Sequence, residues 1–165
     1  MINKINKLSQ SEFIKVFANI FENSTWIANE LYKQKPFNNF EELSSKMLDI
    51  FENTSKKKQL IILNAHPDLA DKTKISSLTP NSKVEQIDVG LDQCTEDEFR
   101  EFKDLNDKYT KKFGFPFIIA VKGKNKSEIL TIFRKRIKNE INLEFQEAKK
   151  QVKKIAHFRL DEIIN

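Results

Sequence analysis

Residues 60–70 read LIILNAHPDLA, four apolar side chains followed by a histidine that stands directly before a proline. Proline fixes its own φ and moves the preceding residue out of the helical region. We therefore expect His66 to lie at a rigid break at the end of a packed segment. Propensity alone leaves open whether Leu60–Leu63 forms a buried strand or part of a buried helix. The same choice is open for the second apolar run, Phe117–Val121.

The composition is typical of a globular, helical protein. The 165 residues include 39% hydrophobic and 32% charged side chains, which is enough for one core, so we expect a single domain over residues 1–165. Only three glycines and four prolines are present, fewer than sheet-rich folds with many tight turns need. Fourteen phenylalanines supply bulk for the core and make disorder unfavourable.

Several features predict a cytoplasmic protein with no membrane partner. No run approaches the roughly 20 apolar residues of a membrane span. The first seven residues lack the apolar segment of a signal peptide. Cys94 is the only cysteine, which argues against an internal disulfide and a cysteine metal site.

Charge is distributed unevenly along the chain. The net charge is +5, but residues 122–160 hold 12 lysines and arginines against 4 acidic residues. Such a basic block can bind nucleic acid, bind a small anion or form a solvated helix surface. Glutamates interleave with the lysines and no nucleic-acid reader motif is present, so a basic helical nucleic-acid-binding module is the weaker alternative.

Capping signals and apolar spacing predict helices along most of the chain. The pairs that fit a capping box are Ser9/Glu12, Ser82/Glu85 and Thr95/Glu98. Asn38 or Asn39 fits a further N-cap, and Phe113-Gly114-Phe115-Pro116 is expected to stop the helix that Thr95 opens. Apolar residues recur at helical spacing over residues 127–160, with Ile141 on the apolar face, which predicts a long C-terminal helical region.

His66 is the strongest candidate for acid–base chemistry, since imidazole titrates near neutral pH with a reference pKa of about 6.5. The alternative is a structural histidine that bonds a nearby carbonyl at a helix boundary. No second histidine lies nearby and no H-E-x-x-H spacing occurs, so no metal is expected. Glu85 can orient the imidazole or can serve only as a helix cap. Gln86 offers a donor and an acceptor to an imide or ureido group, or is simply exposed.

Arg159 falls on the edge of an apolar stripe that includes Val152 and Ile155. A charge there needs either an internal carboxylate or an anionic ligand, and both alternatives are open. The nearby lysines are expected on a solvated face, and these are Lys149, Lys150, Lys153 and Lys154. His157 is expected at the surface.

Five motifs follow one another in order. They are His66-Pro67-Asp68-Leu69-Ala70, Ser82-x-x-Glu85-Gln86, Gly90-Leu91, Phe113-Gly114-Phe115-Pro116-Phe117 and Gln151-Val152-x-x-Ile155-Ala156-x-x-Arg159-Leu160. Together they resemble the 2-oxo-4-hydroxy-4-carboxy-5-ureidoimidazoline (OHCU) decarboxylases of uric acid degradation. The resemblance implies an all-α, single compact helical domain that forms a homodimer and uses no metal or organic cofactor. It also implies that neither apolar run is a strand.

The family reaction removes CO2 from a small ureidoimidazoline to give (S)-allantoin in purine breakdown. The resemblance therefore implies a cofactor-independent carbon–carbon lyase, or a same-fold enzyme for a related ureido or imidazoline acid. His66 corresponds to the family's catalytic histidine and Glu85 to its partner carboxylate. The electron pair left by CO2 must take up a proton on one face, which we expect His66 to deliver.

The substrate-contacting positions of the family carry over to Pro67, Ser82, Lys83, Val84, Glu85, Gln86, Phe117, Ile118, Ile119, Ala120, Val121 and Arg159. The apolar segment is expected to contribute mainly its backbone. Asp71 departs from the glycine that often follows the histidine motif, and this difference affects the expected conformation of the loop.

Overall fold

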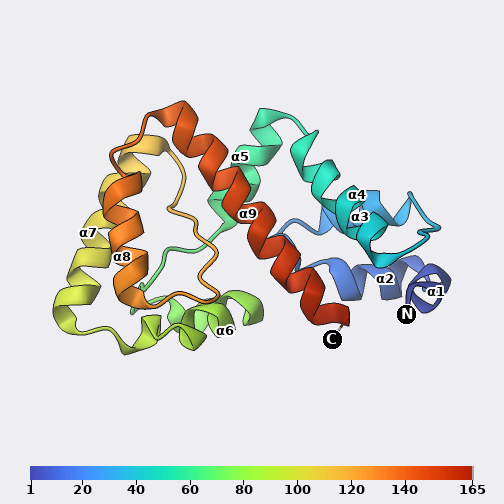
Figure 1. Ribbon diagram of the computed structural model, residues 1–165, viewed down its shortest axis with the longest axis horizontal. Helices are drawn as coiled ribbons and strands as arrows, with labels where there is room; N and C mark the ends of the chain where they lie inside the picture. The colour runs from blue at the N-terminus through green and yellow to red at the C-terminus, as the bar shows by residue number, and fades with distance from the viewer. Residues whose placement is uncertain (165) are drawn as a thin grey trace. The chain divides into compact units, whose positions relative to one another are not determined.

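The computed structural model describes residues 1–164, and within this range every regular element is a helix (Figure 1). The α-helices are α1 (Ile2–Lys7), α2 (Gln10–Phe17), α3 (Thr25–Tyr32), α4 (Phe40–Glu52), α5 (Lys56–Ala65), α6 (Pro80–Asp88), α7 (Glu96–Phe113), α8 (Lys126–Arg136) and α9 (Ile141–Ile164). Two short 3-10 helices are η1 (Ile75–Ser77) and η2 (Leu91–Gln93). The predicted all-α fold class is confirmed.

The chain divides into two compact units. Unit 1 contains residues 1–65 and the chain from Lys153 onward, whereas unit 2 contains residues 66–152. Helix α9 therefore contributes its first half to unit 2 and its second half to unit 1. The assignment of residues 1–165 to one domain stays a prediction.

Phenylalanines build the core of unit 1, where α2 packs on α3 and α3 packs on α4. Phe13 and Phe17 are fully buried, and their ring centroids lie 4.5 Å apart. The predicted capping box of Ser9 and Glu12 starts α2, and Asn39 caps α4. Local capping signals thus set the helix ends, and the aromatic side chains hold the helices together.

The apolar run Leu60–Leu63 belongs to α5. Ile62 and Leu63 are fully buried, whereas Ile61 is 58% exposed, so the helix packs through one face. The helix ends directly before the predicted break at His66. The helical alternative is therefore confirmed for this run.

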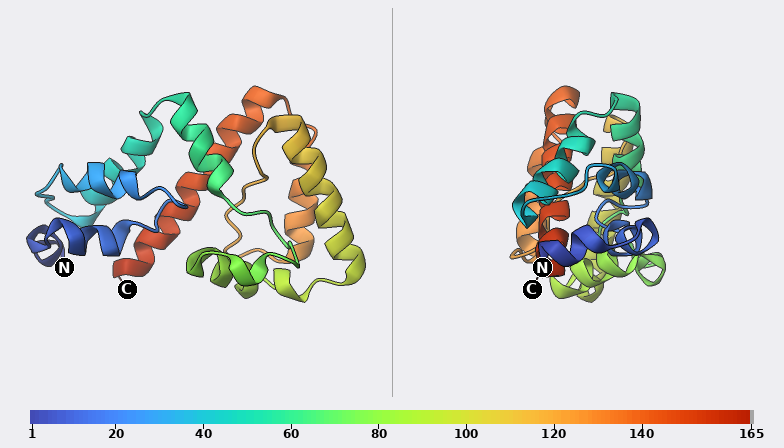
Figure 2. Two further views of the ribbon diagram at one scale, coloured as in Figure 1. Left: turned by 180° about the vertical axis from the view of Figure 1, so that it is seen from behind. Right: turned by 90° about the vertical axis from the view of Figure 1, so that its right-hand side faces the viewer.

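In unit 2, α7 and α8 lie side by side in Figure 1 and in the left view of Figure 2. The ring of Phe133 on α8 lies 6.5 Å from Phe102 and 5.8 Å from Tyr109 on α7. The predicted capping box at Thr95 starts α7, and Gly114 ends it with a φ of 78°. Glycine adopts this left-handed conformation without the steric cost that a Cβ adds.

The predicted C-terminal helical region is confirmed, and it consists of two helices, because α8 ends at Arg136 and α9 begins at Ile141. At this turn the Nζ of Lys112 donates to two backbone carbonyls, at 2.8 and 2.9 Å. The interruption changes the helical phase. Ile141, which was expected on the apolar face, is therefore 55% exposed.

The predicted capping box of Ser82 and Glu85 is also wrong, because α6 begins at Pro80. Thr79 occupies the N-cap position. Proline is well suited to the first helical position, since its fixed φ is already helical and it has no N–H to leave unbonded. Glu85 consequently lies in the interior of α6, beyond the third helical position that a capping box requires.

Candidate active site

His66 follows the last residue of α5 and is the first residue of unit 2. It is only 8% exposed, and Pro67 after it is half-buried. The predicted break between a packed helix and a loop is confirmed here. The imidazole is thus held at the end of a rigid element and largely screened from bulk water.

Two buried amide side chains hold the loop that follows the histidine. Gln86 on α6 donates to the carbonyl of Asp68 at 3.1 Å, and its Oε1 accepts from the N–H of Ala70 at 3.0 Å. Asn106 on α7 donates to the carbonyl of Leu69 at 3.0 Å. Ala70 has a φ of 53°, a conformation that is costly for a residue with a Cβ. These bonds offset that cost and fix the loop.

Gln86 is therefore a loop brace. It is 2% exposed, which excludes the simple alternative of a solvated helix residue. Its amide matches the loop because one carbonyl and one N–H of the loop face its donor and its acceptor. Its contact with substrate stays a prediction.

The loop remains ordered at Asp71, where the sequence departs from glycine. The Asp71 carboxylate accepts hydrogen bonds from the N–H and the hydroxyl of Thr73, at 3.1 and 2.7 Å. Lys74 Nζ lies 3.2 Å from the same carboxylate. Burial acts to raise the pKa of Asp71, but the bonds from Thr73 and Lys74 outweigh it and lower that pKa. The side chain thus builds a local turn of the kind that Asp favours.

The predicted substrate residues on α6 occupy different faces of the helix. Ser82 and Gln86 are buried, Lys83 and Glu85 are half-buried, and Val84 is 56% exposed. Ser82 and Gln86 are separated by one helical turn, so they share a face. Val84 lies on another side, turned toward solvent.

Segment Phe117–Val121 is neither a helix nor a strand, although all five residues are buried. Arg136 Nη1 donates to the carbonyl of Ile118 at 2.7 Å. Gln151 Oε1 accepts from the N–H of Ala120 at 3.0 Å. The strand alternative is excluded here as well, and side chains replace the partners that a sheet would provide.

A buried polar network supports this segment. Glu144, which is fully buried, accepts from Arg136 Nε at 2.7 Å, from the Tyr109 hydroxyl at 2.5 Å and from Asn139 Nδ2 at 3.0 Å. Burial raises the pKa of Tyr109, and the bond to Glu144 raises it further. The carboxylate balances the buried guanidinium, which would otherwise be very costly.

Arg159 lies in unit 1 and is 3% exposed. Its Nη1 is 3.0 Å from Glu22 Oε2 and donates to the carbonyls of Asn19 and Ile20, at 3.1 and 3.4 Å. Of the two alternatives for this arginine, the internal salt bridge is confirmed. Its contact with substrate stays a prediction.

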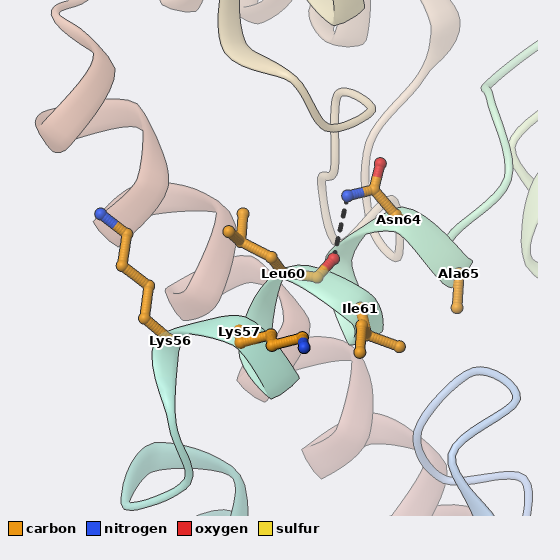
Figure 3. Close-up of a pocket in the computed structure, with 6 residues that line it drawn as sticks. All are labelled: Lys56, Lys57, Leu60, Ile61, Asn64 and Ala65. Carbon is orange, nitrogen blue, oxygen red and sulfur yellow. Dashed lines mark hydrogen bonds between the residues drawn. The ribbon is translucent and has the colours of Figure 1, made fainter.

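An open groove of about 650 Å³ runs along α5 (Figure 3). Its lining consists of Lys56, Lys57, Leu60, Ile61, Asn64 and Ala65. The side-chain amide of Asn64 bonds the carbonyl of Leu60 at 3.0 Å, drawn as the dashed line in Figure 3. These residues supply two ammonium groups, an amide and alkyl surface. They hold no carboxylate or imidazole, so the groove lacks the groups for acid–base catalysis at neutral pH.

A second pocket, of about 410 Å³, lies beside the histidine loop in unit 2 and is lined in part by Asp68, Ala70 and Asn106. Burial raises the pKa of Asp68. None of the predicted substrate residues lines this pocket in the described part of the chain. Asp68 and Ala70 therefore border this pocket and also bond Gln86.

Three polar residues with structural roles at the site were not singled out from the sequence. Asn106 lies among apolar residues of α7, and Arg136 and Glu144 fall at helical spacing from buried neighbours. A polar side chain on an apolar face must find a partner, since its burial without one is costly. The sequence does show that these polar residues lie on the apolar face of a helix. It does not show which group each of them bonds.

The basic block does not form one continuous exposed surface. Arg136, Lys149 and Arg159 are buried, and both arginines pair with glutamates. The prediction of a solvated Lys149 is wrong because the side chain packs 5.8 Å from the ring of Phe145. His157 is exposed, as predicted, and lies 3.6 Å from Asp161.

Residues 1–164 contain neither a metal-binding cluster nor a membrane-spanning helix. No group of three or more histidine, cysteine or acidic side chains there is arranged to hold a metal ion. No helix in this range is both long enough and apolar enough to cross a bilayer.

The model of the OHCU decarboxylase family matches residues 6–161, nearly the whole chain. The chain belongs to the OHCU decarboxylase family. The resemblance carried by the histidine loop, α6, the Gly-Phe-Pro segment and the C-terminal helix is thereby confirmed.

Relatives of this OHCU decarboxylase family member differ in length. It is 35% identical over 161 residues to the 2-oxo-4-hydroxy-4-carboxy-5-ureidoimidazoline decarboxylase of Haloferax volcanii, covering 98% of this chain and 94% of the relative. It is 41% identical over 162 residues to a uric acid degradation bifunctional protein of Bacillus sp. (strain TB-90), covering 98% of this chain. The chain spans only about a third of that protein, since the match covers 32% of its length.

A solved structure shares the fold. The crystal structure of (S)-allantoin synthase is similar with a TM-score of 0.79 and 28% identity, covering 99% of this chain and 54% of the other. The helical fold of this chain is therefore similar to that of (S)-allantoin synthase.

Proposed function

We propose that this protein converts OHCU to (S)-allantoin and CO2 as a carbon–carbon lyase of urate breakdown. The observation that carries the proposal is the family match over residues 6–161. Relatives that carry the OHCU decarboxylase name at nearly the same length support it. The alternative of a basic nucleic-acid-binding module loses support because three cations of the basic block are buried.

The chemistry follows from the substrate's structure. The bond between ring carbon C4 and the carboxylate breaks, CO2 leaves, and the electron pair forms a C4–C5 double bond as the ring C=N takes up a proton. The resulting enol loses its hydroxyl proton to become the C4 carbonyl, while C5 receives a proton. Protonation of one face of C5 gives one enantiomer of allantoin.

We assign the proton transfers to His66, with Glu85 orienting its imidazole. His66 is suited to this role because it is nearly buried at the end of α5 and carries an imidazole, the side chain that serves most often as a general acid or base. Glu85 lies on α6, within a helix that begins at Pro80 with Thr79 as its N-cap. Pro67, Ser82, Lys83, Val84, Gln86 and Phe117–Val121 are proposed to contact the substrate.

Arg159 is proposed to contact an oxygen of the substrate other than the leaving carboxylate. Tight binding of that carboxylate in the ground state would not speed its loss, since only stronger binding of the transition state does so. The proposed assembly is a cytoplasmic homodimer that needs no metal or organic cofactor. Sedimentation equilibrium of the purified chain tests the dimer.

The test of the function forms OHCU in place from urate and follows (S)-allantoin by circular dichroism. His66→Ala should lower kcat/KM by about 10²- to 10⁴-fold, because positioned acid–base catalysis contributes that much. His157→Ala, which removes the exposed histidine, is the matched control and should retain the activity of the unmodified protein.

Equal rates for the His66 and His157 variants would refute the assignment of His66. An unmodified protein that leaves the spontaneous, racemic decay of OHCU unchanged would refute the function itself. Profiling of related ureido and imidazoline acids in the same assay separates OHCU from a close analogue.

A further inference from the structure

Segment Phe117–Val121 runs through the interior of unit 2 without regular structure, and none of its residues is more than 7% exposed. Buried peptide groups need hydrogen-bond partners, because an unpaired one costs free energy. A helix or sheet would supply these partners from the backbone. Here two long side chains from different helices each bond one of these peptide groups.

The first side chain is Arg136 of α8, which donates to the carbonyl of Ile118 at 2.7 Å. The guanidinium is itself fixed. Its Nε donates to Glu144, and its Cζ lies 4.5 Å from the centroid of the Phe117 ring. That ring in turn stacks on Phe133, with centroids 3.8 Å apart and planes 8° apart. Arg136 therefore fixes the start of the segment through both its backbone and its first side chain.

The second side chain is Gln151 of α9, whose Oε1 accepts from the N–H of Ala120 at 3.0 Å. Its Nε2 donates to Glu147, one turn earlier on the same helix, at 2.7 Å. Gln151 is 9% exposed. The amide is thus held in one orientation, with its acceptor directed at the segment.

We propose that Arg136 and Gln151 are positioning residues that set the backbone of Phe117–Val121 for substrate binding. This inference rests on the proposed function, in which the peptide groups of the segment contact the substrate. The two anchored groups, at Ile118 and Ala120, lie on either side of Ile119. The Ile118 carbonyl shares a peptide plane with the Ile119 N–H, and the Ala120 N–H shares one with the Ile119 carbonyl, so the two bonds fix both peptide planes that flank Ile119.

A displaced binding segment weakens substrate binding without changing the acid–base group. Loss of binding that is equal in the ground and transition states raises KM and leaves kcat unchanged. This signature separates positioning from catalysis by His66, and it separates positioning from a general loss of folded protein, which lowers kcat.

The experiment uses Gln151→Met, which keeps the length of the side chain and removes its acceptor, because Arg136 variants disturb a buried ion pair. Gln146→Met, at an exposed position of the same helix, is the matched control. The double variant Glu147→Gln with Gln151→Glu swaps the two side chains. It restores an acceptor for the N–H of Ala120 at position 151 and places the amide donor at position 147. Steady-state kinetics and amide hydrogen exchange of Ala120 are measured for each variant.

Gln151→Met should raise KM about tenfold or more with kcat within about threefold, the loss expected for one hydrogen bond to a binding element. The amide hydrogen of Ala120 should exchange faster than in Gln146→Met. The double variant, Glu147→Gln with Gln151→Glu, should restore KM. The inference would be overturned if Gln151→Met changed neither KM nor the hydrogen exchange of Ala120. It would also be overturned if the double variant failed to restore KM. An inactive unmodified protein refutes the proposed function instead, and Ala120 exchange then tests positioning by itself.

Discussion

Each unit contains a buried arginine–glutamate pair, and the two pairs differ in the groups that surround them. In unit 2, Arg136 Nη2 lies 2.6 Å from Glu144, and in unit 1, Arg159 Nη1 lies 3.0 Å from Glu22. All four side chains are at most 7% exposed. Arg136 also donates to one backbone carbonyl and Arg159 to two, in each case in an irregular stretch of chain. Ion pairing alone therefore does not distinguish a structural arginine from one that contacts a ligand.

The partners of the two glutamates show the difference. Glu144 accepts from three side chains, including Tyr109, so its pair is the centre of a network. The pair of Arg159 instead joins α9 to the chain just after α2 through Nη1, which contacts Glu22 and two carbonyls. A charge fixed by a network is suited to a structural role, whereas the role of Arg159 in binding has to be tested by its effect on KM.

The largest effect is expected for Glu144→Gln. Removing one charge of a buried pair leaves the other uncompensated, which costs about 3–5 kcal/mol in the free energy of unfolding. Urea denaturation measures the change. Glu101→Gln is the control, because Glu101 pairs with Arg134 at an exposed site, where a pair contributes about 0–1 kcal/mol. Equal losses in the two variants would remove the distinction between the network and a surface pair.

A smaller effect is expected for Glu22→Gln. The guanidinium of Arg159 keeps its bonds to the carbonyls of Asn19 and Ile20, and an amide oxygen can replace one carboxylate oxygen. The free energy of unfolding should fall by about 2 kcal/mol, within the range for a hydrogen bond to a charged group. The same denaturation series measures it. A loss larger than that of Glu144→Gln would reverse the order of the two pairs.

The smallest effect is expected for Tyr109→Phe, which removes one donor to Glu144 and should cost about 1–2 kcal/mol at neutral pH. Burial and the bond to Glu144 raise the pKa of Tyr109 in the folded state. Above about pH 10 the unfolded chain therefore loses this proton first, so stability falls as pH rises, and the variant should lessen that fall.

This alkaline series is measured in a Cys94→Ala background. Burial, with a contribution from Glu98, raises the pKa of Cys94 to about 11, so the thiol produces a fall of the same sign between about pH 9 and 11. Identical slopes above pH 10 with and without Tyr109→Phe would contradict the protonated, buried phenol.

The features that the sequence predicted correctly depend on neighbours within a few residues. The capping boxes at Ser9 and Thr95, the end of α7 at Gly114 and the break before Pro67 each need only a short stretch of chain. The start of α6 was also a local signal, but Pro80 competed with the Ser82 pattern and prevailed. Five motifs in a fixed order were enough to identify the family, although none of them describes the geometry of the site.

The tertiary structure alone decided which polar groups meet. Gln86 bonds a residue 16 positions away, Gln151 one 31 positions away, and Arg159 one 137 positions away. Helical spacing places such residues on an apolar face and so predicts that each needs a partner. The partner depends on how distant segments pack, because hydrogen bonds and ion pairs act only over a few ångströms. The histidine loop was thus predictable as a break, whereas the amides that hold it became known only from the fold.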